Sequence, residues 1–322
     1  MSRTIQIGVL NRDAMALQES ARIPLLTTEI PVMADIADAL ASVVAQRTGM
    51  AVIADPGAGK SVALEVARQD FEDMEAEALR LDGTYKIRHL VRLNTIRSTS
   101  TADILRLLYI AAFGAPPVER NYRHRRTDEE LREELVKRFI EEHVVALLID
   151  DAQTLEQPVY DALRDLMAVM VERERGGLEA TTKGQTARPA GLGVLLVGTP
   201  PLWGHLQRHE DYGRRFTKVQ RADSFAEGEL PKILRRLLPA FERGAKAMGD
   251  TKWKALQSEM FGMLAHASIA VVIDVTRTYI FRATNANPKL TAVEKIPWDE
   301  ALFRLAVVEQ VSLQPSHSKD AA

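Results

Sequence analysis

The fold follows from one stretch of the sequence, Ala54-Asp55-Pro56-Gly57-Ala58-Gly59-Lys60-Ser61. It ends as the pattern G-x-x-x-x-G-K-[ST] does, in which small residues let backbone N–H groups curl around phosphate oxygens. The apolar segment 50–53 before it predicts a strand, and the helical period from Ser61 to Glu75 predicts a helix. Because a helix N-terminus favours anions, the stretch predicts a phosphate-binding loop.

Each position of this loop has an expected role. Asp55, Pro56, Gly57, Ala58 and Gly59 are expected to surround the phosphates, Lys60 to reach the β- and γ-phosphates, and Ser61 to ligate Mg²⁺. The first glycine of the pattern is replaced by Ala54, whose methyl group is tolerated only if the backbone there has a negative φ. The alternative interpretation is an ordinary strand–turn–helix connection with two glycines.

Apolar runs on either side of the loop predict the rest of an α/β domain. Strands are expected at 89–94, 144–149 and 194–197. Helices are expected at 32–47, 101–113 and 128–143, and a further one follows the strand at 144–149 and runs to about 175. Thr127-Asp128-Glu129-Glu130 predicts a capped start for the third of these helices. Strands that alternate with helices predict a doubly wound, parallel sheet flanked by helices.

Beyond Glu227 the strand signals fade, apart from the ambiguous run 269–273. Helices are expected at 230–248, 252–265, 275–284 and 299–312. The predicted organisation is therefore an N-terminal arm at 1–22, an α/β nucleotide-binding domain at 23–226, a small helical lid at 227–312 and a disordered tail at 313–322. Residues 175–191, rich in Gly, Thr and Lys, are interpreted as a mobile loop.

Composition excludes several classes of protein. The 322 residues include no cysteine, which excludes disulfides, thiolate zinc sites and a cysteine nucleophile. The apolar runs fall short of the roughly 20 residues of a membrane span, and residues 1–15 show no signal pattern. A cytoplasmic protein without membrane contact is expected. The net charge of −2 gives no global attraction to nucleic acid, so any such contact needs a local basic patch.

Polar residues follow two of the predicted strands. Asp150 and Asp151 end the buried run 144–149, at the edge of a parallel sheet where ligands bind. Asp150 is expected to hold Mg²⁺, and Asp151 to act as the base that orients or deprotonates the attacking water. Thr199 follows the run 194–197 and is expected to sense the γ-phosphate or position water. The chain has no guanine-reading motif, which favours ATP over GTP.

With these motifs in order, the chain resembles the AAA+ ATPases, and within them the regulators of DNA transposition of the TnsC, TniB and MuB type. The resemblance runs from about Ile23 to Val311 and is most specific at the loop 54–61 and at Leu148-Ile149-Asp150-Asp151-Ala152-Gln153. Many relatives carry glutamate where this chain has Asp151. The shorter side chain implies hydrolysis that is slow or depends on assembly.

The resemblance implies a homo-oligomer, a ring or helical filament, with ATP bound between subunits. An arginine of one subunit then touches the γ-phosphate of the next, and Arg214 and Arg215 are the matching candidates. Spacing does not separate the two, although Arg215 is favoured slightly, and a surface basic pair is the alternative. Arg277 and Arg282 are candidates for the sensor arginine of the lid.

The resemblance also implies contact with double-stranded DNA, independent of its sequence and sensitive to salt. The candidate DNA-binding residues, all in predicted loops, are Arg97, Arg120, Arg123, Arg125, Arg126 and Lys183. The alternative is a solvated loop that balances the acidic segment 128–134.

The function expected from the resemblance is an ATP-dependent, DNA-binding regulator that recruits or activates a transposase together with a target-selection protein. Hydrolysis of ATP, with Mg²⁺, is expected to drive disassembly from DNA. One alternative is an AAA+ ATPase that acts on protein partners without DNA, in secretion or remodelling. A second is an ATP switch that hydrolyses slowly.

Overall fold

The computed structural model describes residues 31–94, 100–116, 127–178, 190–208, 212, 216, 218–221, 230–264, 269–287 and 295–312. The chain divides into two compact units, one with the sheet (Val32–Pro56 and Lys60–Asp223) and a helical one that contains Ser224–Ala322. The domain boundaries expected from the sequence stay predictions, and the arm at 1–22 and the tail at 313–322 lie outside the described residues. No described helix is both long and apolar enough to cross a bilayer.

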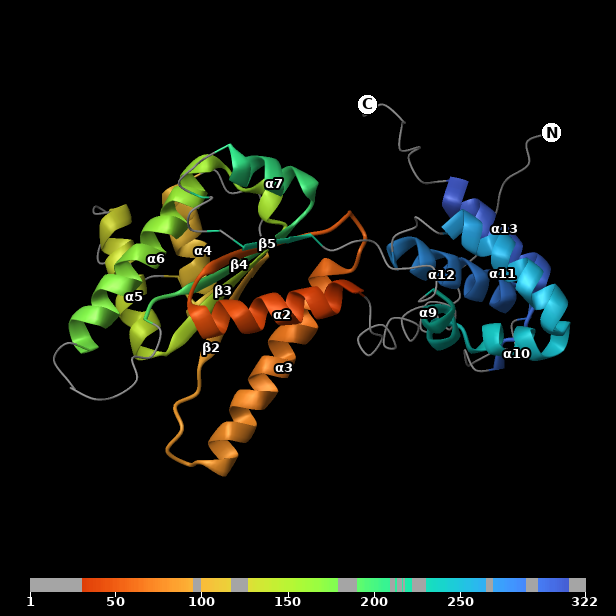
Figure 1. Ribbon diagram of the computed structural model, residues 1–322, viewed down its shortest axis with the longest axis horizontal. Coiled ribbons are helices and arrows are strands. Elements are labelled where there is room, and N and C mark those ends of the chain that lie inside the picture. Colours follow the sequence, from red (N-terminus) through yellow and green to blue (C-terminus); the bar gives the residue numbers. More distant parts are fainter. Residues whose placement is uncertain are drawn as a thin grey trace, which may run out of the picture. The chain divides into compact units, whose positions relative to one another are not determined.

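Five parallel strands form the sheet in the order β2-β3-β4-β1-β5 (Figure 1). The strands are β1 (Gly49–Ile53), β2 (His89–Asn94), β3 (Val144–Asp150), β4 (Gly193–Gly198) and β5 (Lys218–Arg221). Every residue of β1, β3 and β4 is buried, as expected for strands covered on both faces. The predicted α/β fold with a parallel sheet is confirmed.

The strand register brings the predicted site residues to one edge of the sheet. Ile53 at the end of β1 lies opposite Gly198 at the end of β4, and Asn94 at the end of β2 lies opposite Asp150. The phosphate loop, Asp150 and Thr199 therefore follow strands whose carboxyl ends align.

Helices cover both faces of the sheet. A continuous apolar core joins one face to α4 (Thr101–Phe113), α5 (Asp128–Glu141), α6 (Gln157–Leu178) and α7 (Pro200–Gln207). On the other face lie α2 (Pro31–Gln46) and α3 (Lys60–Leu81), and Figure 1 shows the C-terminal half of α3 projecting beyond the sheet. A short 3₁₀ helix, η2 (Ala152–Thr154), follows β3.

The capped start predicted for α5 is confirmed. The Thr127 hydroxyl accepts from the backbone N–H of Glu130, and the Glu130 carboxylate accepts from the backbone N–H of Thr127, which is a capping box. At α4, Ser100 caps the N-terminus and Gly114 ends the helix with a φ of 71°, a left-handed conformation that favours glycine.

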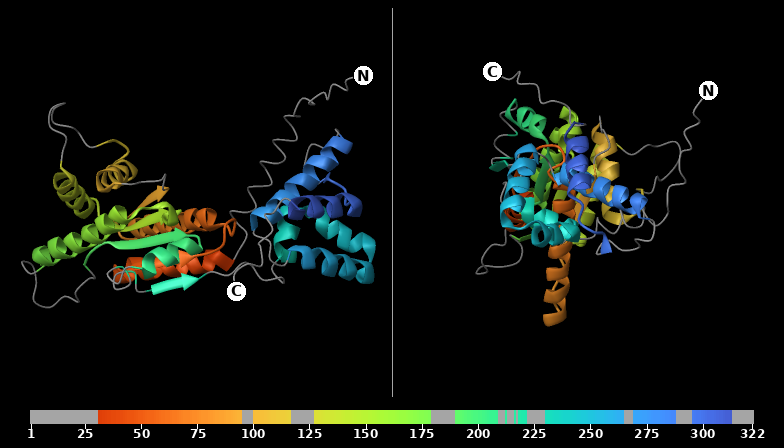
Figure 2. Two further views of the ribbon diagram at one scale, coloured as in Figure 1. Left: turned by 90° about the horizontal axis from the view of Figure 1, so that it is seen from above. Right: turned by 90° about the vertical axis from the view of Figure 1, so that its right-hand side faces the viewer.

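The helical unit contains α9 (Leu230–Leu237), α10 (Pro239–Met248), α11 (Asp250–Leu264), α12 (Ile269–Ala286) and α13 (Glu300–Ser312), shown in teal and blue in both views of Figure 2. Its core is a cluster of rings in mutual contact, whose members are Phe241, Trp253, Tyr279, Trp298 and Phe303. Gly244 lies so close to Trp298 that an added Cβ would stand 2.5 Å from the indole.

Several sequence expectations differ from the structure. Residues 175–178, expected in a mobile loop, form the end of α6. The single helix expected at 230–248 is two, because Pro239 has no N–H to continue α9 and instead starts α10. The ambiguous run 269–273 is the first part of α12, not a strand. The strand β5 was not predicted, because Lys218–Arg221 is short and mostly polar.

Candidate functional site

The connection between β1 and α3 has the conformation that a phosphate loop needs. Gly57 and Gly59 have φ values of 77° and 86°, a region that side chains other than glycine rarely occupy. Ala54 is not among the described residues with positive φ, it is buried, and its N–H donates to the Gly198 carbonyl at 3.1 Å. The methyl group that replaces the usual first glycine is therefore accommodated without strain.

Lys60, the first residue of α3, is folded back onto this loop. Its Nζ donates to the carbonyl oxygens of Ala54 at 3.0 Å and Asp55 at 2.8 Å, and the side chain is buried. Burial lowers the pKa of Lys60, while the carboxylates of Asp151, Asp150 and Asp55 oppose that change. The loop thus already contains a cation that is held by carbonyl dipoles and has three carboxylates around it.

Two carboxylates end β3, and they differ in environment. Asp150 is 3% exposed, and its Oδ1 accepts the backbone N–H of Asp151 at 3.0 Å. Asp151 is exposed and has a left-handed backbone, with φ 51° and ψ 37°. Aspartate tolerates this conformation better than most residues, because its short polar side chain can hydrogen-bond locally. The strand end therefore presents one fixed carboxylate and one accessible carboxylate.

Gln153 joins the ends of β3 and β4. Its Nε2 donates to Asp151 Oδ1 at 3.3 Å, and its Oε1 accepts the backbone N–H of Thr199 at 3.1 Å. Gly198 leaves room for this bridge, because an added Cβ would stand 2.6 Å from Gln153 Oε1. The candidate base and Thr199 are thus linked through one amide. The sequence contains Gln153 within the motif 148–153 but does not show that it bridges two strands.

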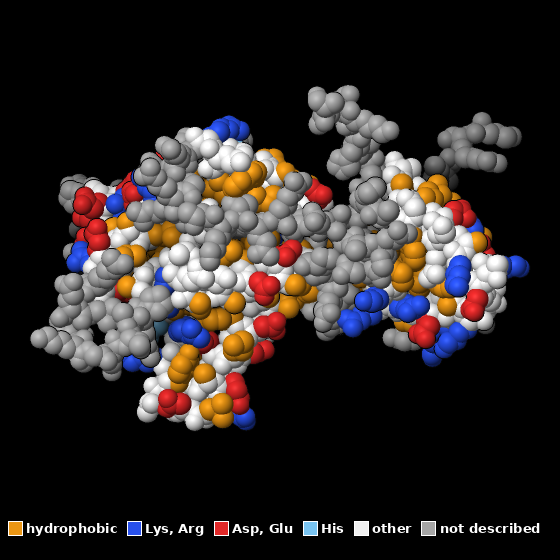
Figure 3. All heavy atoms as spheres, in the orientation of Figure 1, with side chains coloured by type: hydrophobic (Ala, Val, Ile, Leu, Met, Phe, Trp, Pro, Cys, Tyr) orange, Lys and Arg blue, Asp and Glu red, His pale blue; other side chains and the backbone are white. Residues whose placement is uncertain are grey.

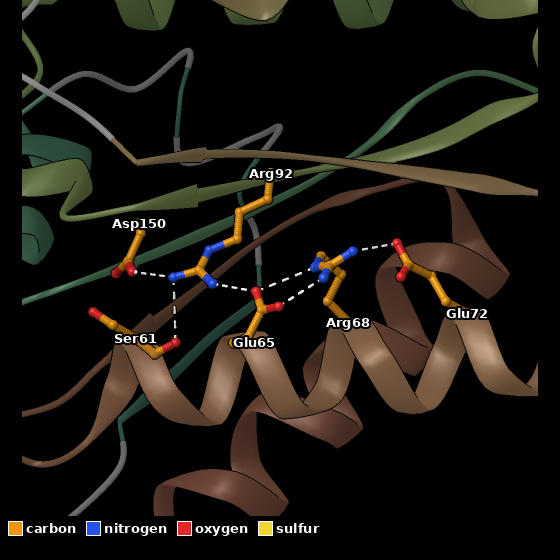
Figure 4. Close-up of polar contacts among 6 residues, drawn as sticks. All are labelled: Ser61, Glu65, Arg68, Glu72, Arg92 and Asp150. Atoms are coloured by element: carbon orange, nitrogen blue, oxygen red, sulfur yellow. Dashed lines mark hydrogen bonds and ion pairs between the residues drawn. The ribbon is translucent and has the colours of Figure 1, made fainter. Parts of the chain in front are cut away.

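A second group that the sequence did not identify lies beside Asp150 (Figure 4). Arg92 on β2 donates through Nη2 to Asp150 Oδ2 at 3.1 Å and to the Ser61 carbonyl at 3.3 Å. Its Nη1 donates to Glu65, one helical turn after Ser61. Glu65 also accepts from Arg68, which lowers the pKa of Glu65 and keeps it charged near neutral pH.

The residues at this edge fit a magnesium ion. Mg²⁺ prefers oxygen ligands and is usually bound by one or two protein groups together with substrate phosphates. Arg92 Nη2 contacts both Asp150 and the Ser61 backbone, so the buried carboxylate and the residue with the candidate hydroxyl lie close together. Within the described ranges, no cluster of three or more His, Cys, Asp or Glu residues could hold a metal by itself.

Arg277 and Arg282, the candidates for a sensor arginine, lie in the helical unit, and both are paired. Arg277 Nη1 is 3.1 Å from Asp274 Oδ1, and Arg282 is ion-paired with Glu309. Both line an open pocket of about 580 Å³ between α12 and α13. The other predicted residues lie outside the described residues: Arg97, Arg120, Arg123, Arg125, Arg126, Lys183, Arg214 and Arg215.

Comparisons with known proteins concern the family and the fold. Residues 44–206, about half of the chain, match a family model described as AAA domain. No curated protein matches the chain.

Among solved structures, the Aeropyrum pernix ORC2 protein in its ADPNP-ADP complexes is similar over 98% of this chain and 72% of its own, at 15% identity and a TM-score of 0.56. Its ADP form is similar over 91% of this chain and 67% of its own, at 16% identity and a TM-score of 0.53. Cdc6p from Pyrobaculum aerophilum is similar over 82% of this chain and 65% of its own, at 15% identity and a TM-score of 0.53. At such identities the likeness concerns the fold alone.

Proposed function

Because the chain belongs to the AAA domain family, we propose that it binds and hydrolyses ATP with Mg²⁺ at the loop between β1 and α3. One observation carries the proposal: the glycine loop, the carboxylates of Asp150 and Asp151, and Thr199 meet at one edge of the sheet. This is where ligands bind in parallel α/β sheets. A solved structure of similar fold is described with ADPNP and ADP.

The side chains divide the work as follows. Lys60 would leave the carbonyls of Ala54 and Asp55 to pair with phosphate oxygens, while Ser61 and Asp150 would hold Mg²⁺. When bound, Mg²⁺ would supply positive charge that neutralises the phosphates. Asp151, held by the amide of Gln153, orients the attacking water or accepts its proton. Aspartate is one methylene shorter than the glutamate of many relatives, so slow turnover is expected.

The test of this site is nucleotide binding by Lys60→Ala. The variant loses the charge that pairs with the phosphates, and we expect no measurable ATP binding by calorimetry. Lys137→Ala, which removes an exposed lysine of α5, is the matched control and should bind ATP as the unchanged protein does. Equal ATP affinity in Lys60→Ala and the control contradicts the assignment.

The finer proposal is that ATP-bound subunits assemble on double-stranded DNA and recruit or activate a transposase, with a target-selection protein as further partner. Hydrolysis then favours disassembly. The resemblance of the ordered motifs to transposition regulators supports it. A patch of exposed basic side chains supports DNA contact: Lys232, Arg235 and Arg236 on α9 are exposed, and Figure 3 shows blue side chains gathered over α9 and α10.

Binding to random duplex DNA at several salt concentrations tests the finer proposal. We expect ATP to strengthen binding. Replacement of Arg123, Arg125 and Arg126 by alanine should weaken the salt dependence of binding. The slope of log K against log salt concentration should become shallower by about 0.9 for each DNA phosphate that these arginines no longer neutralise. Arg215→Ala, compared with Arg214→Ala, should keep ATP binding but lose DNA-stimulated phosphate release. ATP-bound protein that ignores duplex DNA favours the alternative, an ATPase acting on protein partners.

A further inference from the structure

Arg92 stands out because a full positive charge lies beside the carboxylate expected to hold Mg²⁺. Its side chain is 17% exposed, that of Asp150 is 5% exposed, and Arg92 Nη2 is 3.1 Å from Asp150 Oδ2. Arg92 Nε is buried and makes no hydrogen bond to any part of the chain that the structure describes. A guanidinium that has lost this much water must be stabilised by the groups around it.

Those groups belong to the two elements that form the site. Asp150 ends β3, while Ser61 and Glu65 belong to the first turns of α3, directly after the phosphate loop. Figure 4 shows Arg92 reaching from its strand to all three. Arg92 therefore connects the expected metal carboxylate to the helix that starts at the phosphate loop.

The same contacts divide the charge of Arg92 between two carboxylates. Glu65 shares its own charge with Arg68, whose Nη2 is 2.6 Å from Glu65 Oε1, and Arg68 is in turn paired with Glu72. The ion pairs thus form a chain from Asp150 through Arg92, Glu65 and Arg68 to Glu72. A change of charge at Glu65 alters how strongly Arg92 acts on Asp150.

We propose that Arg92 is a positioning residue that sets the Mg²⁺ concentration at which the site binds nucleotide with its metal. Before the metal arrives, Arg92 compensates the charge of the Asp150 carboxylate, which the Asp151 backbone N–H also holds. Once Mg²⁺ is present, the guanidinium repels it and competes for the same carboxylate. The ion pair with Glu65 weakens that competition, because it compensates part of the positive charge of Arg92. The inference rests on the proposed nucleotide site.

Repulsion outweighs the positioning effect in deciding metal affinity. Without Arg92, Asp150 remains held by the Asp151 backbone N–H at 3.0 Å and by its own burial, so the carboxylate stays in place. The loss of a positive charge close to a divalent cation, by contrast, strengthens metal binding directly. Even with the screening of bulk water, charges at contact distances change an affinity by about tenfold.

Three variants separate charge from structure. Arg92→Gln removes the charge and should lower the Mg²⁺ concentration for half-maximal nucleotide binding by about tenfold. Arg92→Lys keeps the charge, so its half-maximal Mg²⁺ concentration should stay close to that of the protein without substitutions. Glu65→Gln leaves Arg92 with less carboxylate charge and should raise the half-maximal concentration several-fold. Arg80→Gln, on an exposed part of α3, is the control for loss of an arginine that is far more exposed.

The experiment titrates MgCl₂ into full-length protein with a fluorescent, non-hydrolysable ATP analogue, from a baseline in EDTA, and circular dichroism verifies folding. Opposite shifts for Arg92→Gln and Glu65→Gln support the inference, because mere loosening of the structure would weaken binding in both. An unchanged or raised half-maximal Mg²⁺ concentration in Arg92→Gln overturns the inference. If that variant misfolds, an unchanged or lowered half-maximal Mg²⁺ concentration in Glu65→Gln overturns it instead. If the protein without substitutions binds no analogue at any Mg²⁺ concentration, that result also refutes the proposed function.

Discussion

Replacement of Arg88 by alanine tests how the long helix α3 is fastened to the sheet. Glu75 on α3 has a side chain only 3% exposed, and Arg88, directly before β2, donates to it through Nε at 3.0 Å and through Nη2. The Arg88 backbone N–H, at 2.8 Å, and the Tyr85 hydroxyl, at 2.9 Å, also donate to Glu75 Oε2. The pair therefore joins the C-terminal half of α3 to the start of an edge strand.

The cost of the change follows from the groups that still surround Glu75. Removing one partner of a buried ion pair costs about 3–5 kcal/mol, because the other charge is left without compensation. In Arg88→Ala, Tyr85 and the backbone N–H still stabilise Glu75, and the lost Arg88 side chain is itself 39% exposed, so we expect the low end, about 3 kcal/mol. Arg80→Ala is the matched control on the same helix. Its pair with Glu77 is exposed and should contribute at most about 0.5 kcal/mol.

Dependence on pH distinguishes an ion pair from a loss of packing. Burial alone raises the pKa of Glu75, but hydrogen bonds from Arg88 and Tyr85 outweigh burial and lower it below its usual value. A carboxylate with a lowered folded pKa contributes stability above the unfolded pKa, about 4.3, and this is lost as the pH falls through the folded pKa. Without the Arg88 side chain burial dominates, and a protonated Glu75 is tolerated better. The difference between variant and unchanged protein should shrink toward about pH 4.

Urea unfolding followed by far-UV circular dichroism, at about pH 7 and about pH 4, measures both effects. The expected result is a loss of about 3 kcal/mol near neutral pH that falls by half or more in acid, with little change in Arg80→Ala at either pH. A loss for Arg88→Ala no larger than that of the control, or one independent of pH, refutes the reasoning.

Two further predictions concern packing and helix capping. Gly193→Ala should destabilise the protein by about 2 kcal/mol, because the new Cβ would stand 2.6 Å from the Val43 carbonyl oxygen; Gly262→Ala, with open space around it, should be neutral or stabilising by urea unfolding. Thr127→Ala should cost about 1 kcal/mol of unfolding free energy because it removes the cap on Glu130, and Thr127→Ser, which keeps the hydroxyl, should restore most of it. Equal stability within either pair of variants contradicts the corresponding structural assignment.

Much of the fold could be predicted because the signals are local. The run 144–149 is apolar at every position, as a strand buried on both faces requires, and it is the core of β3. β2 and α4 begin and end where the sequence pattern places them. β5 could not be predicted, since Lys218–Arg221 has only one apolar residue and becomes a strand by pairing with β1. Pairing of this kind depends on a partner more than a hundred residues away in the sequence, which no local window contains.

The sequence by itself determined the phosphate loop, because glycines, lysine and serine at fixed spacing between a strand and a helix have few other uses. It also placed Asp150 and Asp151 at the end of a buried strand. What only the tertiary structure decided is how these groups are held. Arg92 lies 58 residues before Asp150, and Gln153 lies 46 before Thr199. Such contacts exist because parallel pairing brings the carboxyl ends of distant strands together, and their order in the sheet follows from the whole chain.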